Sequence, residues 1–486
     1  MATSRARLFL ENFFVYGMVG VLGKAIPFVM LPLITRLIND PAVFGKFDLY
    51  HLIISFGSPL VVLGMYDSMF RFFFEDSSID YRKTICSSAL LIVLASGVIV
   101  LLAGFMASPL LTRFVFGESQ SRNLVYVALL VIFVSATKSI VAAPTRMQNQ
   151  RKIYLIMNIV LPAASYGISV PVIILGYPLW GLIAGSALSA AISLVVFWHL
   201  NGKWFSMKHV HFNKAKELLK FGVPLAPTFF IYWIFNACDR LMIVHMIGQD
   251  AVGIYGIGAK LAGVSTLIYM AFSGGWQYFA FSTMKDEDHT RLMSNVFEVL
   301  GVLSIASLFF SLPFVNILFE LFVGEVYRKG SVVFPFLFLS PLLLMLYQIL
   351  GSQMLVAKKS YISTIVLSVG AFANIALNWI LIPIMSIKGA AIATLLGYVI
   401  SLILAFIVVK KMNLIYSNWR VKLVFVCAGL SLIIVNLWPN SVSIISPAFL
   451  VLILAIYLSR IKEPLCSVWQ VLLYKKKRTS KTGNEG

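Results

Sequence analysis

Four cations lie within long apolar segments, where a charged side chain is costly, and they are the first candidates for chemistry: Lys24, Lys138, Arg240 and Lys260. A cation at membrane depth costs roughly 2.5–3.5 kcal/mol or more and usually faces a protein interior or a water-filled cavity. Lys24 lies about 11 residues from either end of residues 13–34, or roughly 16 Å along a helix. Lys260 lies about nine residues from the nearer end of its segment, whereas Arg240 and Lys138 lie about five from an end and could snorkel to the interface.

Acids at the same depth are scarce, so the balance of buried charge favours an anionic ligand. Asp239 is the only carboxylate clearly inside an apolar segment, and Asp48 lies near the end of one. Asp67 and Arg71 are four residues apart and can pair on a helix. Asp239 and Arg240 are adjacent, point about 100° apart and need separate partners. A cavity lined by cations suits a phosphate, diphosphate or carboxylate, and suits an organic cation poorly.

The elements that position these residues are transmembrane helices. The chain has 486 residues, of which 60% are hydrophobic and 12% charged, whereas a soluble protein carries about 25% charged residues. We therefore predict an all-α, polytopic membrane protein without a soluble domain. The apolar stretches predict fourteen spans, at residues 13–34, 44–70, 84–107, 122–143, 153–175, 179–199, 218–245, 251–275, 292–318, 331–356, 361–383, 387–410, 418–437 and 443–460.

The formal net charge of +20 reports topology before it reports a partner. With the N-terminus in the cytoplasm, seven of the 39 Lys and Arg residues lie in outer connections and four inside spans, and the rest lie in cytoplasmic loops and tails. This asymmetry is the positive-inside pattern, and it predicts that both termini are cytoplasmic. A nucleic-acid partner is not expected. The basic tail at residues 474–478 is interpreted as an anchor on anionic lipid.

The sequence contains no pattern typical of an enzyme, a metal site or a cofactor site. A P-loop, a nucleophile elbow and a zinc-protease motif are absent. The four cysteines are scattered without metal or disulfide spacing. His209 and His211 have no nearby carboxylate or cysteine in the sequence, so they are interpreted as solvated residues of a connection. We expect a transporter without catalytic residues, metal or cofactor.

A weak internal repeat predicts how the spans are grouped. Residues 42–47 (AVFGKF) and 250–255 (DAVGIY) each follow an outer turn and carry a glycine followed by an aromatic residue two positions later. Their offset spans six helices, so two six-helix lobes are related by a pseudo-two-fold axis along the membrane normal, with the substrate site between them. The predicted organisation is an N-terminal lobe at 1–200, a cytoplasmic linker at 201–217, a C-terminal lobe at 218–411, two additional helices at 412–460 and a basic tail at 461–486.

Several short motifs resemble the polysaccharide flippases of the multidrug/oligosaccharidyl-lipid/polysaccharide exporter superfamily. PLITRL at residues 32–37, FGKF at 44–47 and LGMYDSMFRFF at 63–73 resemble the first half of these proteins. DR at 239–240 followed by VGIY at 252–255 resembles the start of their second half. The family serves the O-antigen, capsule and exopolysaccharide pathways, and hence lipopolysaccharide biosynthesis.

The resemblance implies a flippase in the bacterial cytoplasmic membrane that moves undecaprenyl-diphosphate-linked oligosaccharide to the outer leaflet by alternating access. It implies that cavity cations meet the diphosphate, with Lys24 the best match and Lys260, Arg240 and Lys138 behind it. Asp67, Arg71 and Asp239 are structural or gating candidates. A polysaccharide polymerase and a chain-length regulator are implied as partners by the family alone.

Two alternatives stay open at this point. A multidrug antiporter of the same superfamily needs a protonatable or ion-binding carboxylate within its lobes, and span one offers Lys24 without a mid-span acid. A flippase for the peptidoglycan lipid precursor also has fourteen spans and a cationic cavity. The sequence does not identify the sugar, the pathway, the coupled ion or the oligomeric state.

Overall fold

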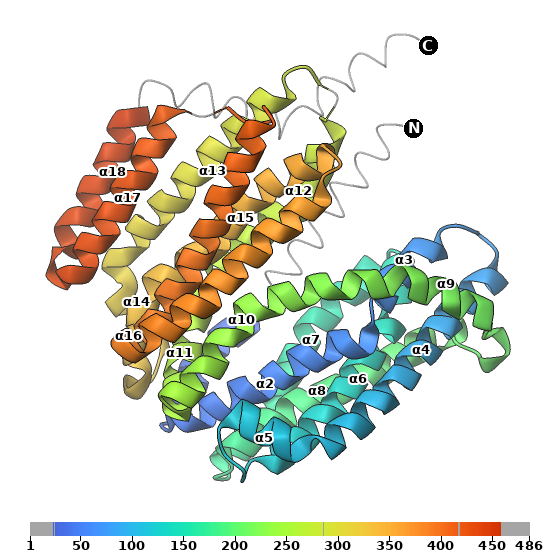
Figure 1. The fold of residues 1–486 in the computed structure, drawn as a ribbon. Helices are drawn as coiled ribbons and strands as arrows, with labels where there is room; N and C mark the ends of the chain where they lie inside the picture. The colour runs from blue at the N-terminus through green and yellow to red at the C-terminus, as the bar shows by residue number, and fades with distance from the viewer. Residues whose placement is uncertain (1–22, 24, 285, 417, 458–486) are drawn as a thin grey trace.

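Helices of the protein form two bundles and a terminal pair (Figure 1). The computed structural model describes residues 23, 25–284, 286–416 and 418–457, and these residues contain helices and no strand, which confirms the all-α prediction. A helix at Ala25–Leu37 precedes the first bundle. That bundle consists of α2 (Pro41–Val62), α3 (Met65–Phe73), α4 (Ile79–Met106), α5 (Ser108–Phe116), α6 (Arg122–Met147), α7 (Arg151–Ile174) and α8 (Pro178–Asn201). The second bundle consists of α10 (Ala226–Met246), α11 (Gln249–Ala262), α12 (Ser265–Ser282), α13 (His289–Ser311), α14 (Val315–Phe322), α15 (Phe334–Val356) and α16 (Ser360–Lys411), and the terminal pair is α17 (Trp419–Leu437) and α18 (Val442–Tyr457).

The predicted spans correspond to these helices, several of which are bent. Nine helices in the described part of the chain are long and apolar enough to cross a membrane, or ten if α2 and α3, bent by 43°, form one span. The count is lower than fourteen partly because α16 contains two helices that join at Ser386, where φ is 54°. That kink falls between the predicted spans 361–383 and 387–410. The first predicted span is described only from residue 23 onward.

Local sequence explains where α2 begins and ends. The Asp40 side chain accepts a hydrogen bond from the Ala42 backbone N–H, and Pro41 occupies the first helical turn. The helix stops at Leu63 and Gly64, whose φ values of 49° and 71° lie in the left-handed region. A residue without a Cβ adopts that conformation at no steric cost, so Gly64 places the bend before α3.

The two bundles meet at one end and diverge toward the other (Figure 1). We call the end at which the bundles meet the closed end. There the Tyr327 hydroxyl donates to the Ile38 carbonyl over 2.7 Å, and the Gln249 side-chain amide donates to the Phe116 carbonyl over 3.0 Å. The opposite end, where the connection between the bundles lies, is the open end. Hydrogen bonds to backbone carbonyls across the closed end tie the bundles together there.

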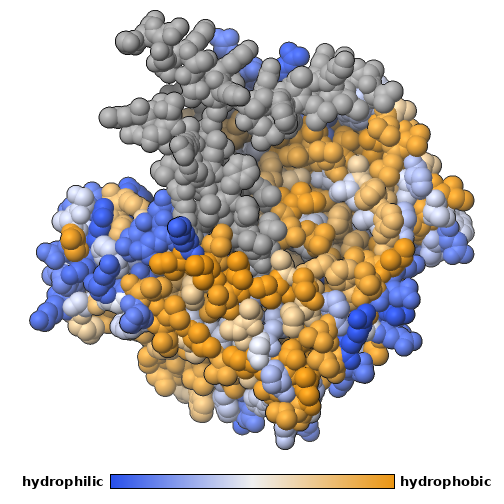
Figure 2. Space-filling model, turned by 180° about the vertical axis from the view of Figure 1, so that it is seen from behind, coloured by the Kyte–Doolittle hydropathy of each residue, from blue (hydrophilic) through white to orange (hydrophobic). Residues whose placement is uncertain are grey.

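The surface is largely hydrophobic, as contact with lipid requires. Figure 2 shows a broad hydrophobic face with hydrophilic groups gathered at its margins. Many large apolar side chains of the described residues are exposed, among them Ile99 at 66% and Val195 at 68%. An exposed apolar surface of this extent is typical of a membrane-embedded protein and not of a soluble monomer. We conclude that this is a multi-pass membrane protein.

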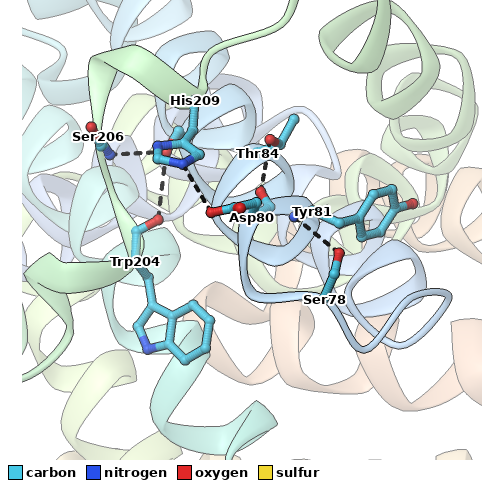
Figure 3. A network of polar contacts seen from close by, with 8 residues as sticks. Ser78, Asp80, Tyr81, Thr84, Trp204, Ser206 and His209 are labelled. Carbon is cyan, nitrogen blue, oxygen red and sulfur yellow. Dashed lines mark hydrogen bonds and ion pairs between the residues drawn. The ribbon is translucent and has the colours of Figure 1, made fainter.

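The connection between the bundles is fastened to the first of them (Figure 3). Within residues 202–211, the Ser206 backbone N–H donates to the Ser87 hydroxyl over 2.9 Å. His209 Nε2 lies 3.4 Å from Asp80 Oδ1 (Figure 3). Ser87 and Asp80 both belong to the first half of α4. The connection therefore lies against α4.

The amphipathic helix α9 (Phe212–Gly222) follows and belongs to the same bundle. It packs against α3 and α4, and the Ser68 hydroxyl of α3 donates to the Leu218 carbonyl over 3.0 Å. The helical spacing at residues 212–221 predicts such an element on the membrane surface. The chain then passes through the 3-10 turn η3 (Val223–Leu225) into α10 and the second bundle.

Candidate functional site

A cavity of about 700 Å³ lies among helices of both bundles. Helix Ala25–Leu37, α2, α7 and α8 supply most of its wall, and the end of α11, the turn after it and the start of α12 supply the rest. Ligand cavities typically measure about 300–1,000 Å³, so this one admits a small polar head group. Its polar lining residues are His51, Ser165, Tyr166, Ser169, Ser186, Lys260 and Thr266.

Among the described residues, Lys260 is the cation that lines the cavity. Its Nζ lies 5.4 Å from the centre of the Phe44 ring and 5.9 Å from that of Phe47, and all three residues line the cavity. Aromatic faces at these distances attract an ammonium group. The Lys260 side chain is 40% exposed. It is therefore held at the wall and remains accessible from the cavity.

Asp48 of α2 joins Lys260 to Arg240 of α10. The Lys260 ammonium lies 3.2 Å from Asp48 Oδ1, and the Arg240 Nε lies 3.3 Å from Asp48 Oδ2. The Asp48 side chain is 10% exposed. One carboxylate of the first bundle thus faces two cations of the second. Asp48 is a second buried acid beside the predicted Asp239, so the excess of cations at this depth is smaller than the sequence suggests.

The glycine motifs of the internal repeat meet beside this ion pair. A Cβ on Gly45 of α2 would collide with the Gln249 carbonyl oxygen, and a Cβ on Gly253 of α11 would collide with the Pro41 carbonyl oxygen. A Cβ on Gly256 would collide with Asp48 Oδ2. Glycine is required at these positions because α2 and α11 approach so closely. The repeat therefore forms the contact between the bundles at the closed end.

A surface ion pair supports the same end. Lys46 Nζ lies 3.0 Å from Glu118 Oε1 in the turn after α5. Burial alone would raise the pKa of the Glu118 carboxyl, but hydrogen bonds from Ser121, Lys46 and Gln249 outweigh it and hold the pKa below its ordinary 4.5. Glu118 therefore links the first bundle to Gln249 of the second as a carboxylate.

Asp239 occupies a separate polar cluster within the second bundle. Its Oδ2 accepts hydrogen bonds from the hydroxyls of Tyr255, over 2.6 Å, and Thr394, over 2.5 Å. Its Oδ1 accepts one from the Asn378 amide over 2.7 Å, and the Cys238 thiol donates to Asn374 Oδ1 over 2.9 Å. The Asn378 side-chain oxygen is buried without a partner among the described residues. Carboxylate, hydroxyl and amide oxygens of this kind suit a proton or a hard cation.

The remaining predicted residues lie away from the cavity or outside the described chain. Lys138 of α6 does not line the cavity, and it forms no hydrogen bond or ion pair with another described residue. Arg71 is ion-paired with Glu75 over 3.1 Å, and among the described residues it forms no ion pair with Asp67. Lys24 lies outside the described residues, so its cavity role stays a prediction, although Ala25 lines the cavity.

The described residues contain no group of three His, Cys, Asp or Glu side chains that could hold a metal ion. His209 instead contacts Asp80 (Figure 3).

Asp48 is the site residue that the sequence did not single out. It follows the motif glycine Gly45 by three positions, so both lie on one face of α2. Its repeat mate at the offset of 208 is Gly256, the glycine whose Cβ would strike it. An acid on the glycine face of one repeat, at the position where the other repeat has a glycine, is the sequence pattern that indicates Asp48 as a contact residue.

Comparison with known proteins identifies the family. Residues 33–332 match a family model described as polysaccharide biosynthesis protein. The match covers more than half of the chain, so the chain belongs to this family, as the resemblance of its motifs indicates. An uncharacterized membrane protein of Methanocaldococcus jannaschii is 23% identical over 355 residues, which cover 68% of this chain and 81% of that protein.

Two solved structures share the fold. The lipid II flippase MurJ in an inward closed conformation aligns with a TM-score of 0.64 and 14% identity, covering 92% of this chain and all of that one. An inward-facing multidrug resistance MATE transporter aligns with a TM-score of 0.65 and 13% identity, covering 82% and 94% of the two chains. At these identities the likeness shows the fold alone, which is that of the exporter superfamily named above.

Proposed function

We propose that this protein is a flippase that moves a polyprenyl-diphosphate-linked oligosaccharide across the bacterial cytoplasmic membrane for surface polysaccharide synthesis. The observation that carries the proposal is the cavity of about 700 Å³ between the bundles, with the accessible Lys260 ammonium on its wall. Membership of the polysaccharide biosynthesis family supports the substrate class. The positive-inside pattern favours an orientation with the open end in the cytoplasm.

The cavity offers one feature for each part of such a substrate. The Lys260 ammonium is the partner for the diphosphate, because charge-assisted hydrogen bonds to phosphate oxygens are strong. The hydroxyls of Ser165, Ser169 and Ser186 and the ring of Tyr166 face the sugar. The prenyl tail stays in lipid, and rocking of the bundles exposes the head group at the other side.

The test is the distribution of lipid-linked oligosaccharide between leaflets in cells that contain or lack the protein. We expect accumulation in the cytoplasmic leaflet and loss of surface polysaccharide in the deletion and in Lys24→Glu and Lys260→Gln cells. Lys410→Gln, which changes an exposed lysine in the last turn of α16, is the matched control and keeps wild-type transport. Normal surface polysaccharide in the deletion, with no redundant transporter, would refute the proposal.

A second candidate, the multidrug antiporter, is favoured by one observation. Asp239 is 3% exposed and lies among hydroxyl and amide groups in the second bundle, as an ion-coupled extruder would require. Deletion would then raise drug susceptibility and leave surface polysaccharide intact, and Asp239→Asn would reproduce the deletion. Rescue of a cell deficient in the peptidoglycan-precursor flippase would instead identify that substrate.

A further inference from the structure

Asp48 of the first bundle is ion-paired with both Lys260 and Arg240. Both cations belong to the second bundle, on α11 and α10. The ion pairs therefore join the bundles to each other and not helices within one bundle. They lie next to the backbone contact of Gly45 with α11, at the closed end. Any motion that separates α2 from α11 must break them.

The three charged groups differ in their access to the cavity. Lys260 lines the cavity, whereas Asp48 and Arg240 do not. The exposed fractions of the side chains follow the same order, at 40% for Lys260, 24% for Arg240 and 10% for Asp48. An anion in the cavity would therefore meet Lys260 before Arg240 or Asp48.

The charges of Asp48, Lys260 and Arg240 do not balance, so a second anion can bind beside them. One carboxylate faces two cations, so the three groups together carry one net positive charge. A diphosphate carries more negative charge than a carboxylate and offers more acceptor oxygens. A partly buried ion pair is close to break-even, because desolvation offsets its attraction, so exchanging one anionic partner for another is energetically accessible.

We propose that Asp48 is an exchangeable anion that holds the closed end shut until the diphosphate of the substrate takes Lys260 from it. This inference rests on the proposed function, whose substrate supplies the diphosphate. A ligand shifts a conformational equilibrium only through its different affinity for the two states. Here the difference arises because the diphosphate competes with a contact that exists only in the closed state. Binding of substrate thereby weakens the contact between α2 and α11.

The experiment measures exposure of the closed end in the purified full-length chain in nanodiscs. The reporter is Val252→Cys on α11, which is fully buried, in an active background whose four native cysteines have been replaced. The rate of its labelling by a water-soluble maleimide is measured alone, with undecaprenyl diphosphate in the nanodisc and with inorganic diphosphate. The variants are Asp48→Asn, Asp48→Glu and the control Asp286→Asn, whose carboxylate is exposed between α12 and α13.

Undecaprenyl diphosphate is expected to raise the labelling rate of the wild type and of Asp286→Asn. Asp48→Asn should label about 5- to 150-fold faster than the wild type without lipid, the range of ordinary coupling energies, and respond little to it. Asp48→Glu keeps the carboxylate, so its labelling rate should still rise with the lipid. This variant shows whether the lost lipid response of Asp48→Asn comes from the missing charge or from misfolding. A rise with inorganic diphosphate alone also supports exchange and assigns recognition to the diphosphate.

The inference is overturned if Asp48→Asn labels at the wild-type rate and still responds to the lipid. That result leaves the proposed function standing when cells still depend on the protein for export of the lipid-linked oligosaccharide. Conversely, normal leaflet distribution in the deletion refutes the proposed function. If Asp48→Asn then still labels faster than the wild type without lipid, Asp48 holds the bundles closed but does not exchange with a diphosphate.

Discussion

Gly45→Ala tests the contact between the bundles with the smallest possible change. The new methyl group would collide with the Gln249 carbonyl oxygen and lie 3.3 Å from the Gly253 backbone nitrogen. Both are backbone atoms of α11, so the collision is relieved only when α2 and α11 move apart. Overpacking by one methyl group typically costs about 1–3 kcal/mol. A penalty of that size on the closed state alone shifts the equilibrium between closed and separated bundles by about 5- to 150-fold.

Gly167→Ala in α7 is the matched control, because no atom lies within 4 Å of a Cβ at that position. Each substitution gains roughly 0.8–1.0 kcal/mol of helix propensity, so the two proteins differ chiefly in the collision. Labelling of Val252→Cys by a membrane-impermeant maleimide on intact cells should rise in Gly45→Ala and stay at the wild-type rate in Gly167→Ala. Equal labelling of both at the same abundance would refute the role assigned to the glycine contact.

Three further outcomes are expected. Lys260→Gln should lower export of lipid-linked oligosaccharide by about 10- to 150-fold, since a hydrogen bond to a charged group contributes about 1.5–3 kcal/mol, and Lys260→Arg should retain more of it. Asp239→Asn should lower the thermal stability of the purified protein measurably, because a buried network loses its charged acceptor. The control Asp250→Asn, at an exposed carboxylate, should leave the thermal stability unchanged. Labelling of the closed end, taken relative to that of a fully exposed cysteine at the same pH because maleimide reacts with the thiolate, should increase as pH falls below 4.5. The pKa of the Glu118 carboxyl is held below 4.5, so its ion pair with Lys46 stabilises the closed end above that pH and is lost as the carboxyl is protonated. In Glu118→Gln, which does not titrate, this rise should be smaller.

The helices themselves follow from the sequence, because an apolar segment of sufficient length has few alternatives to a helix in a membrane. The sequence predicts a boundary between spans 361–383 and 387–410, and the structure has a kink at Ser386 there. Where helices bend within one apolar segment, as at Leu63 and Gly64, the sequence shows only a glycine, and many glycines in this chain do not mark a bend.

The charged site could be predicted only in part, because pairing across bundles depends on the register of two distant helices. Lys260 and Arg240 were identified from the cost of burying a cation. Their partner Asp48 is separated from Lys260 by 212 residues, so no local spacing indicates the contact. It becomes apparent only when the repeat motifs are seen to pack face to face through Gly45 and Gly253. Lys24 keeps the standing of a prediction.

The attachment of α9 to α3 and α4 determines how the halves of the molecule are tethered. Because α9 and the residues before it are bonded to the first bundle, the covalent tether left between the bundles is the three-residue turn η3. Three extended residues reach at most about 10 Å. Such a short tether lets the halves pivot about a fulcrum near Val223–Leu225 but prevents them from drifting apart at that point. The connection between the bundles is thus a rigid extension of the first bundle, joined to the second through a short hinge, and not a flexible linker.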